Sequence, residues 1–161
     1  MPLSNPQAFL MTKYIQMLDV RTAGTVGGAV GTVGSWYSRT INTIRYDDTS
    51  SVSLSNNLFI LPTGTYEIDC NAFFSRVGRC KIRLRNVTDN VVIMYGQSAY
   101  FITANASNGL VNLAGKFTIA SNKQLSVEYR TGESFNDQSL GIESNFGVEE
   151  IYLTLNLRKI G

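Results

Sequence analysis

The 161-residue chain contains no histidine and only two cysteines, Cys70 and Cys80. Without histidine, a serine or cysteine nucleophile cannot be activated by the usual triad. A structural zinc site needs four nitrogen or sulfur ligands, and two thiols cannot supply them. We therefore expect both cysteines to be buried free thiols, with a single disulfide between them as the alternative.

The carboxylates do not offer a catalytic arrangement either. Glu149 and Glu150 are adjacent on an expected strand, so their side chains point to opposite faces and cannot form one acid–base pair. Asp47 and Asp48 are typical of a polar turn, with weak calcium binding as the alternative. We predict that the protein is not an enzyme, with no catalytic, cofactor-binding or metal-ligating residues and no cofactor.

Charge is also scarce, because charged residues make up 16% of the chain and the net charge is +2 at pH 7. Such a small charge predicts no field that would attract nucleic acid or an anionic membrane. The longest apolar runs, such as VVIMY at 91–95, have the length of a strand and are too short to span a bilayer. The start, MPLSNPQAFLMTK, lacks the pattern of a signal peptide, which favours synthesis in a reducing cytoplasm.

What the chain does contain is alternation with a period of two. The segments TYEIDCNAF, RCKIRLR and EIYLTLNLR each place apolar and polar residues on opposite faces, as half-buried antiparallel strands do. Strands are expected near 13–21, 36–45, 51–54, 58–61, 65–74, 79–87, 91–95, 110–119, 124–130 and 148–159. The expected core contains Ile68, Cys70, Ile82, Leu84, Phe117, Ile119, Leu153, Leu155 and Leu157. We predict an all-β sandwich, with residues 1–12 as a short N-terminal arm and residues 13–161 as one domain.

One hairpin can be tested by its register. If strands 65–74 and 79–87 pair about Ser75, opposite residues have numbers that sum to 150. The expected pairs are Glu67 with Arg83, Asp69 with Lys81, and Cys70 with Cys80. The two charge pairs would stabilise the outer face of this hairpin.

A second conspicuous stretch, Thr22–Trp36, is rich in glycine: TAGTVGGAVGTVGSW. It has no lysine after its last glycine, as a phosphate-binding P-loop needs, and it has no G-x-G of a dinucleotide fingerprint. Gly27-Gly28 breaks the three-residue period that collagen requires. We interpret the stretch as a flexible loop between the first two strands.

A basic run lies at the middle of the chain, with Arg76, Arg79, Lys81, Arg83 and Arg85 at nearly alternate positions. Phosphate or an acidic partner would suit it, but no aromatic residues interleave with the cations as single-stranded nucleic acid would require. We interpret the run as a solvated strand face whose charges are partly balanced by acidic residues of the preceding strand, Glu67 and Asp69.

Three short motifs occur in a telling order. They are W-x-x-R-x-x-N (Trp36, Arg39, Asn42), F-x-L-P-x-G-x-Y (Phe59, Leu61, Pro62, Gly64, Tyr66) and R-L-x-N-x-T-D (Arg83, Leu84, Asn86, Thr88, Asp89). Together they resemble a tumour-necrosis-factor-like jelly roll of the complement globular-head type, above all the version found in bacteriophage virion proteins. The resemblance implies a ten-stranded, two-sheet jelly roll that forms a homotrimer and binds through loops or outer faces without chemistry.

Two sets of residues are candidates for contacts between chains. Tyr129 and Tyr152 stand at nominally outward strand positions, and exposed aromatic rings are costly unless a partner covers them, so we predict them in the trimer interface. In the arm, Phe9, Leu10 and Met11 are predicted to dock into a groove on a capsid protein.

The predicted function is a structural protein of the bacteriophage virion, made in the host cytoplasm, whose trimeric knob decorates or cements the capsid. A fibre-tip or adsorption protein that binds a receptor is the first alternative, and a free-standing ligand-binding module outside a virus is the second. The expected partners are further copies of the chain and other capsid or fibre proteins, with a host surface glycan or protein left open. Neither nucleic acid nor membrane insertion is expected.

Overall fold

A computed structural model describes residues 12–161, and this part of the chain contains eleven strands and no helix. The strands are β1 (Lys13–Arg21), β2 (Tyr37–Ser38), β3 (Thr43–Asp47), β4 (Ser53–Ser55), β5 (Leu58–Leu61), β6 (Gly64–Phe74), β7 (Gly78–Asn86), β8 (Val91–Phe101), β9 (Gly109–Ile119), β10 (Lys123–Thr131) and β11 (Glu150–Lys159). No helix among these residues could span a membrane. The predicted docking residues Phe9, Leu10 and Met11 lie outside the described residues.

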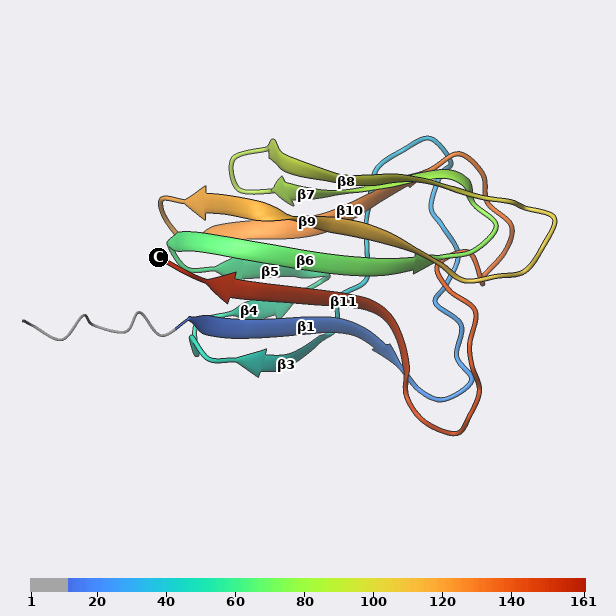
Figure 1. Ribbon diagram of the computed structural model, residues 1–161, viewed down its shortest axis with the longest axis horizontal. Helices are drawn as coiled ribbons and strands as arrows, with labels where there is room; N and C mark the ends of the chain where they lie inside the picture. Colours follow the sequence, from blue (N-terminus) through green and yellow to red (C-terminus); the bar gives the residue numbers. More distant parts are fainter. Residues whose placement is uncertain (1–11) are drawn as a thin grey trace, which may run out of the picture.

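The strands form two antiparallel sheets packed face to face (Figure 1). The five-stranded sheet has the order β3-β1-β11-β6-β9, and the six-stranded sheet has the order β4-β5-β10-β7-β8, with β2 also paired to β10. The C-terminus and the start of β1 lie at one end of the sandwich, while the longest connecting loops lie at the other end. The all-β two-sheet architecture predicted from the alternation is confirmed.

The predicted hairpin of residues 65–74 and 79–87 is wrong. β6 pairs with β11 and β9, whereas β7 pairs with β10 and β8, so the two strands belong to different sheets. Three residues, Ser75–Val77, carry the chain across, and the positive φ angles of Arg76 (55°) and Gly78 (60°) turn it away from a hairpin. Alternating charges on the outer face of a strand can pair with several different neighbouring strands. They therefore did not determine which strands lie beside β6.

The core lies between the sheets and matches the expected alternation. All nine predicted core residues are buried, each with at most 6% of its surface exposed. The predicted strand 36–45 is in fact two short strands, β2 and β3, because a buried segment interrupts it. That segment contains Arg39, whose side chain is fully buried, and Ile41.

The glycine-rich stretch is a loop, as predicted, but hydrogen bonds fix it to the loop between β10 and β11. The Gly27 amide donates to the Gly141 carbonyl (2.9 Å), and the Leu140 amide donates to the Gly28 carbonyl (2.9 Å). A Cβ atom on Gly27 would lie 2.3 Å from the Leu140 oxygen, so only glycine allows this approach.

Candidate functional site

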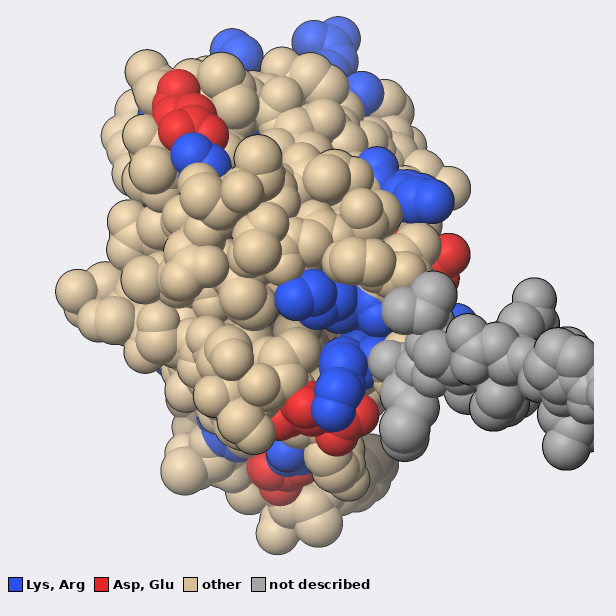
Figure 2. All heavy atoms as spheres, turned by 90° about the vertical axis from the view of Figure 1, so that its left-hand side faces the viewer, with Lys and Arg blue, Asp and Glu red and all other residues tan. Residues whose placement is uncertain are grey.

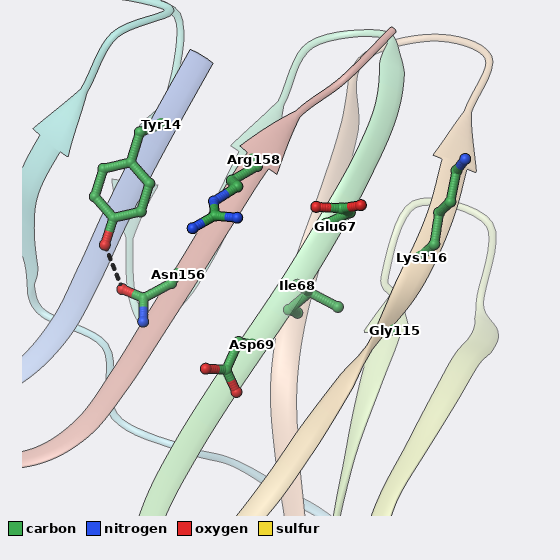
Figure 3. Close-up of a pocket in the computed structure, with 8 residues that line it drawn as sticks. All are labelled: Tyr14, Glu67, Ile68, Asp69, Gly115, Lys116, Asn156 and Arg158. Carbon is green, nitrogen blue, oxygen red and sulfur yellow. Dashed lines mark hydrogen bonds between the residues drawn. The ribbon is translucent and has the colours of Figure 1, made fainter. Parts of the chain in front are cut away.

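A hollow of about 560 Å³ lies on the outer face of the five-stranded sheet (Figure 3). Its lining residues are Tyr14, Glu67, Ile68, Asp69, Gly115, Lys116, Asn156 and Arg158. We call the outward side chains of this sheet the polar face. They come from β1, β11, β6 and β9, which pair in register, so residues far apart in the sequence stand in rows across the sheet.

Hydrogen bonds among amides, hydroxyls and one carboxylate organise much of the polar face. The Tyr14 hydroxyl donates to Asn156 Oδ1 (2.7 Å), and Gln16 Nε2 donates to the same oxygen (3.0 Å). Farther along, Asn112 Nδ2 donates to Asp69 Oδ1 (2.7 Å). Amides and hydroxyls arranged in this way are typical of a binding surface.

The same face also holds charges of both signs in one row. Arg158, Glu67 and Lys116 are opposite one another on β11, β6 and β9, and Figure 3 shows Glu67 between the two cations. None of the three forms an ion pair with another residue of the 12–161 range. The row can therefore pair with charges on a second molecule.

The polar face ends at the open side of the sandwich, where β8 and β9 are the last strands of their sheets and lie close together. We call these two strands the open edge. Each strand has 11 residues, and Lys116 is the single charged residue on either of them. Leu110 on β9 is exposed (54%). Long, nearly uncharged edge strands are unusual on a free surface because they can pair with other chains.

The end of the sandwich where the C-terminus and the start of β1 lie differs in its distribution of charge. Figure 2 shows that its Lys, Arg, Asp and Glu side chains stand in small separate groups on a mostly uncharged surface. In the turn between β7 and β8, Asp89 forms an ion pair with Lys123 at the start of β10 (2.7 Å). This end presents no field of one sign that would select a charged partner.

Comparison with known proteins places the fold. The globular domain of zebrafish complement 1qA matches with a TM-score of 0.59 and 14% identity, covering 93% of this chain and 98% of that one. Murine APRIL matches with a TM-score of 0.58 and 11% identity, covering 92% and 98%. The chain has the TNF- and C1q-like jelly-roll fold. No family model matches it, and neither does any curated protein sequence. At these identities, the likeness concerns the fold alone.

Within this jelly roll, the two tyrosines predicted at a trimer interface are not on the surface. Tyr129 is 4% exposed because it continues the inward row of Leu125 and Val127 on β10. Tyr152 is 2% exposed, and its hydroxyl donates to the Thr25 carbonyl of the glycine-rich loop (2.8 Å). The premise that both rings are exposed is wrong, while the interface assignment itself is not tested by a single chain.

The buried thiols agree with the prediction, and their burial has a chemical consequence. Cys70 on β6 and Cys80 on β7 are both free and buried, and they belong to different sheets. Burial in the core raises the pKa of each thiol to about 12. Both cysteines are therefore core residues with little thiolate character at neutral pH.

The two carboxylate pairs serve the loops. Asp47 accepts hydrogen bonds from the amides of Thr49, Ser51 and Val52, as expected of a polar turn. Glu149 pairs with Arg45 (2.6 Å).

Glu150 holds a different loop. It accepts the amides of Ser144 (3.0 Å), Asn145 (2.7 Å) and Gly24 (3.3 Å). Those hydrogen bonds, led by the Ser144 amide, lower the pKa of Glu150 to about 2.

The basic run is balanced differently from the prediction. Glu67 and Asp69 lie on the other sheet, so they cannot balance its charges. The neighbouring acid is Glu128 on β10, which pairs with Arg83 (2.6 Å) and Arg85 (3.1 Å). No local pattern indicates this pairing, because β10 follows β7 by about forty residues and its register depends on the whole sheet.

Proposed function

We propose that the protein is a non-enzymatic structural module that assembles as a homotrimer, and that this trimer is a bacteriophage virion protein. The open edge carries the proposal for assembly. A folded chain normally protects edge strands with charge, proline or a bulge, or covers them. Here β9 contains no proline, no register shift and a single charge, Lys116; β8 contains neither charge nor proline, and its pairing with β7 shifts register twice. Covering them with another copy of the chain removes this liability.

The polar face supplies a surface for the open edge of the next copy. The row of Arg158, Glu67 and Lys116 offers ionic partners, and the hydrogen-bonded amides around it are fixed in place. An edge placed on a different face of its neighbour is a head-to-tail contact, which generates a closed ring when the rotation closes. A threefold ring agrees with the trimer implied by the sequence resemblance.

The virion role is supported by the sequence motifs around Trp36, Phe59 and Arg83 that resemble bacteriophage virion proteins. Capsid decoration is favoured over the tail, because the apolar Phe9, Leu10 and Met11 suit a groove on another protein. A fibre-tip or adsorption protein is the alternative within the virion.

The assembly is tested by measuring mass in solution. Sedimentation equilibrium should give three times the chain mass of 17.8 kDa at micromolar concentration. Ala114→Arg adds a bulky charge to an exposed position of β9 and should yield monomers. The matched control, Ser53→Arg, adds the same charge at an exposed position of β4, at the far side of the other sheet, and should remain trimeric. A monomeric wild type, or equal dissociation of both variants, contradicts the assembly.

The virion role needs a separate experiment. Cryo-EM of phage particles from cells that make the chain should show trimeric density at symmetry axes of the capsid. A chain that begins at Lys13 should still trimerise but should no longer bind capsids. Density confined to the tail tip would replace capsid decoration by the adsorption role, and absence of the chain from purified particles would refute a virion role.

A further inference from the structure

A second hollow, of about 490 Å³, lies on the outer face of the six-stranded sheet. We call it the cationic groove. Its lining residues are Gly34, Trp36, Arg79, Cys80, Lys81, Ser98, Ala99, Arg130, Thr131 and Gly132. The lining combines Trp36 and three cations with small residues such as Gly34, Ser98 and Gly132. A pocket of this volume accommodates a small ligand.

The floor of the groove carries cations that oppose one another. Lys81 on β7 is directly opposite Arg130 on β10, and Arg79 is the next outward residue of β7. Like charges at opposite positions of neighbouring strands are destabilising. None of the three forms an ion pair with a residue of the described 12–161 range. Glu133 lies near Gly78, at the edge of this region, but it is not paired with Arg79.

The next row along the sheet shows the contrast. There, Arg83 is opposite Glu128, and the two form an ion pair at 2.6 Å. The fold therefore neutralises the cation beside the groove and leaves those inside it without a carboxylate. An anionic ligand would relieve the repulsion in the groove and pair with guanidinium groups that are well shaped for carboxylates.

Aromatic rings stand along the same cations. The Arg83 guanidinium carbon lies 4.1 Å from the Trp36 ring centroid, which holds the indole at the rim of the groove. Tyr95 packs 6.1 Å from Trp36 between ring centroids, and Lys81 Nζ lies 5.8 Å from the Tyr95 ring. Tyr100, directly opposite Arg79, is 64% exposed. The groove thus combines cations with aromatic surface.

We propose that the cationic groove binds a carboxylated sugar unit of an acidic polysaccharide. The apolar C–H face of a sugar ring packs on an aromatic side chain, while its carboxylate pairs with arginine and lysine. Single-stranded nucleic acid fits less well, because it needs successive stacking platforms along a continuous channel. Here one face of Trp36 is already occupied by Arg83, and the hollow is a single pocket.

The test uses calorimetry with a hexamer of mannuronate, alongside the glucuronate monomer, neutral dextran and oligothymidylate. The hexamer should bind, more weakly at 0.5 M salt, and dextran should not. Replacing both floor cations (Lys81→Gln with Arg130→Gln) should weaken binding at least tenfold, and so should Trp36→Leu. The matched control removes two cations at the paired ends of β1 and β11 (Lys13→Gln with Lys159→Gln) and should change affinity less than twofold.

Several results would overturn the proposal. They are the absence of hexamer binding at millimolar concentration, an equal loss in the control that replaces Lys13 and Lys159, and tighter binding of oligothymidylate than of the hexamer. Binding of the monomer as tight as that of the hexamer would show a site for small carboxylates and would refute the polysaccharide. The trimer is not required, because a monomeric Ala114→Arg chain should still bind the hexamer, so the two proposals can fail separately.

Discussion

Replacing Arg39 with methionine should destabilise the fold strongly. Arg39 is fully buried, and its Nη2 atom donates to the carbonyls of Leu140 (2.6 Å), Phe73 (3.0 Å) and Tyr152 (3.4 Å). These carbonyls belong to three separate segments, so one side chain connects β6, β11 and the loop before β11. Methionine fills a similar volume but donates no hydrogen bond.

The expected loss of stability follows from the burial of Arg39 and from its charge interaction with Asp19. Arg39 Nη1 lies 3.6 Å from Asp19 Oδ2, which is a charge attraction without a hydrogen bond, while Arg21 keeps its own contact with Asp19 at 2.8 Å. Removing one partner of a buried ion pair costs about 3–5 kcal/mol. Because domains of this size have an unfolding free energy of about 5–15 kcal/mol, the loss is a large share of stability.

The pH dependence gives the prediction a second signature. Burial raises the pKa of Asp19, and the Arg39 charge opposes that rise. A carboxyl whose pKa is higher in the folded state than in the unfolded state favours folding when protonated, so its contribution falls as pH rises above the unfolded value. Without Arg39 the Asp19 pKa rises further, and the destabilisation should grow from pH 4 to pH 7. Asp19→Asn should recover part of it at pH 7.

Urea unfolding, followed by the fluorescence of the single tryptophan, Trp36, at fixed protein concentration, measures these changes. The matched control is Arg45→Met, which breaks a surface pair with Glu149. Exposed pairs contribute about 0–1 kcal/mol. If the unfolding free energy of Arg39→Met lies within about 1 kcal/mol of the wild-type value, or equals that of the control, then the inference that a buried ion pair holds these segments is wrong.

Three further outcomes can be checked directly. Glu150→Gln should speed amide hydrogen exchange in the loop before β11 at pH 7, whereas Glu149→Gln should not. Because the pKa of Glu150 is lowered to about 2, the wild-type loop should lose this protection only as the pH falls from 4.5 towards 2. Cys70 and Cys80 should resist a thiol reagent at pH 8 and react only in urea, and rapid labelling of the native protein would contradict their burial. Gly27→Ala should lower the unfolding free energy by about 1–3 kcal/mol in urea titrations, because its Cβ would overlap a backbone carbonyl, and an unchanged midpoint would contradict this.

The alternation of residues such as Ile68 and Leu84 was enough to predict the strands and the core, because each inward side chain reports its own burial. Pairing between strands was not predictable in the same way. The chain passes from β6 to the other sheet through Arg76 and Gly78, whose positive φ angles are a property of the folded backbone. Tyr152 shows a related limit. It stands on an outer face, but the loops that contain Thr25 and Gly141 cover it, and the sequence around Tyr152 does not predict this contact.

The net charge of the chain does not show where its charged residues lie in the folded structure. A net charge of +2 predicts no strong field, and at the end of the sandwich shown in Figure 2 the charges are indeed mixed. On the outer face of β7 and β10, however, five cations surround one carboxylate, Glu128. The compensating acids lie elsewhere, including Glu67 and Asp69 on the opposite sheet. A ligand in the cationic groove responds to its nearest charges, because salt screens the distant ones within about 8–10 Å. A nearly neutral chain can therefore hold a site for an anion whenever the fold separates its acids from its bases.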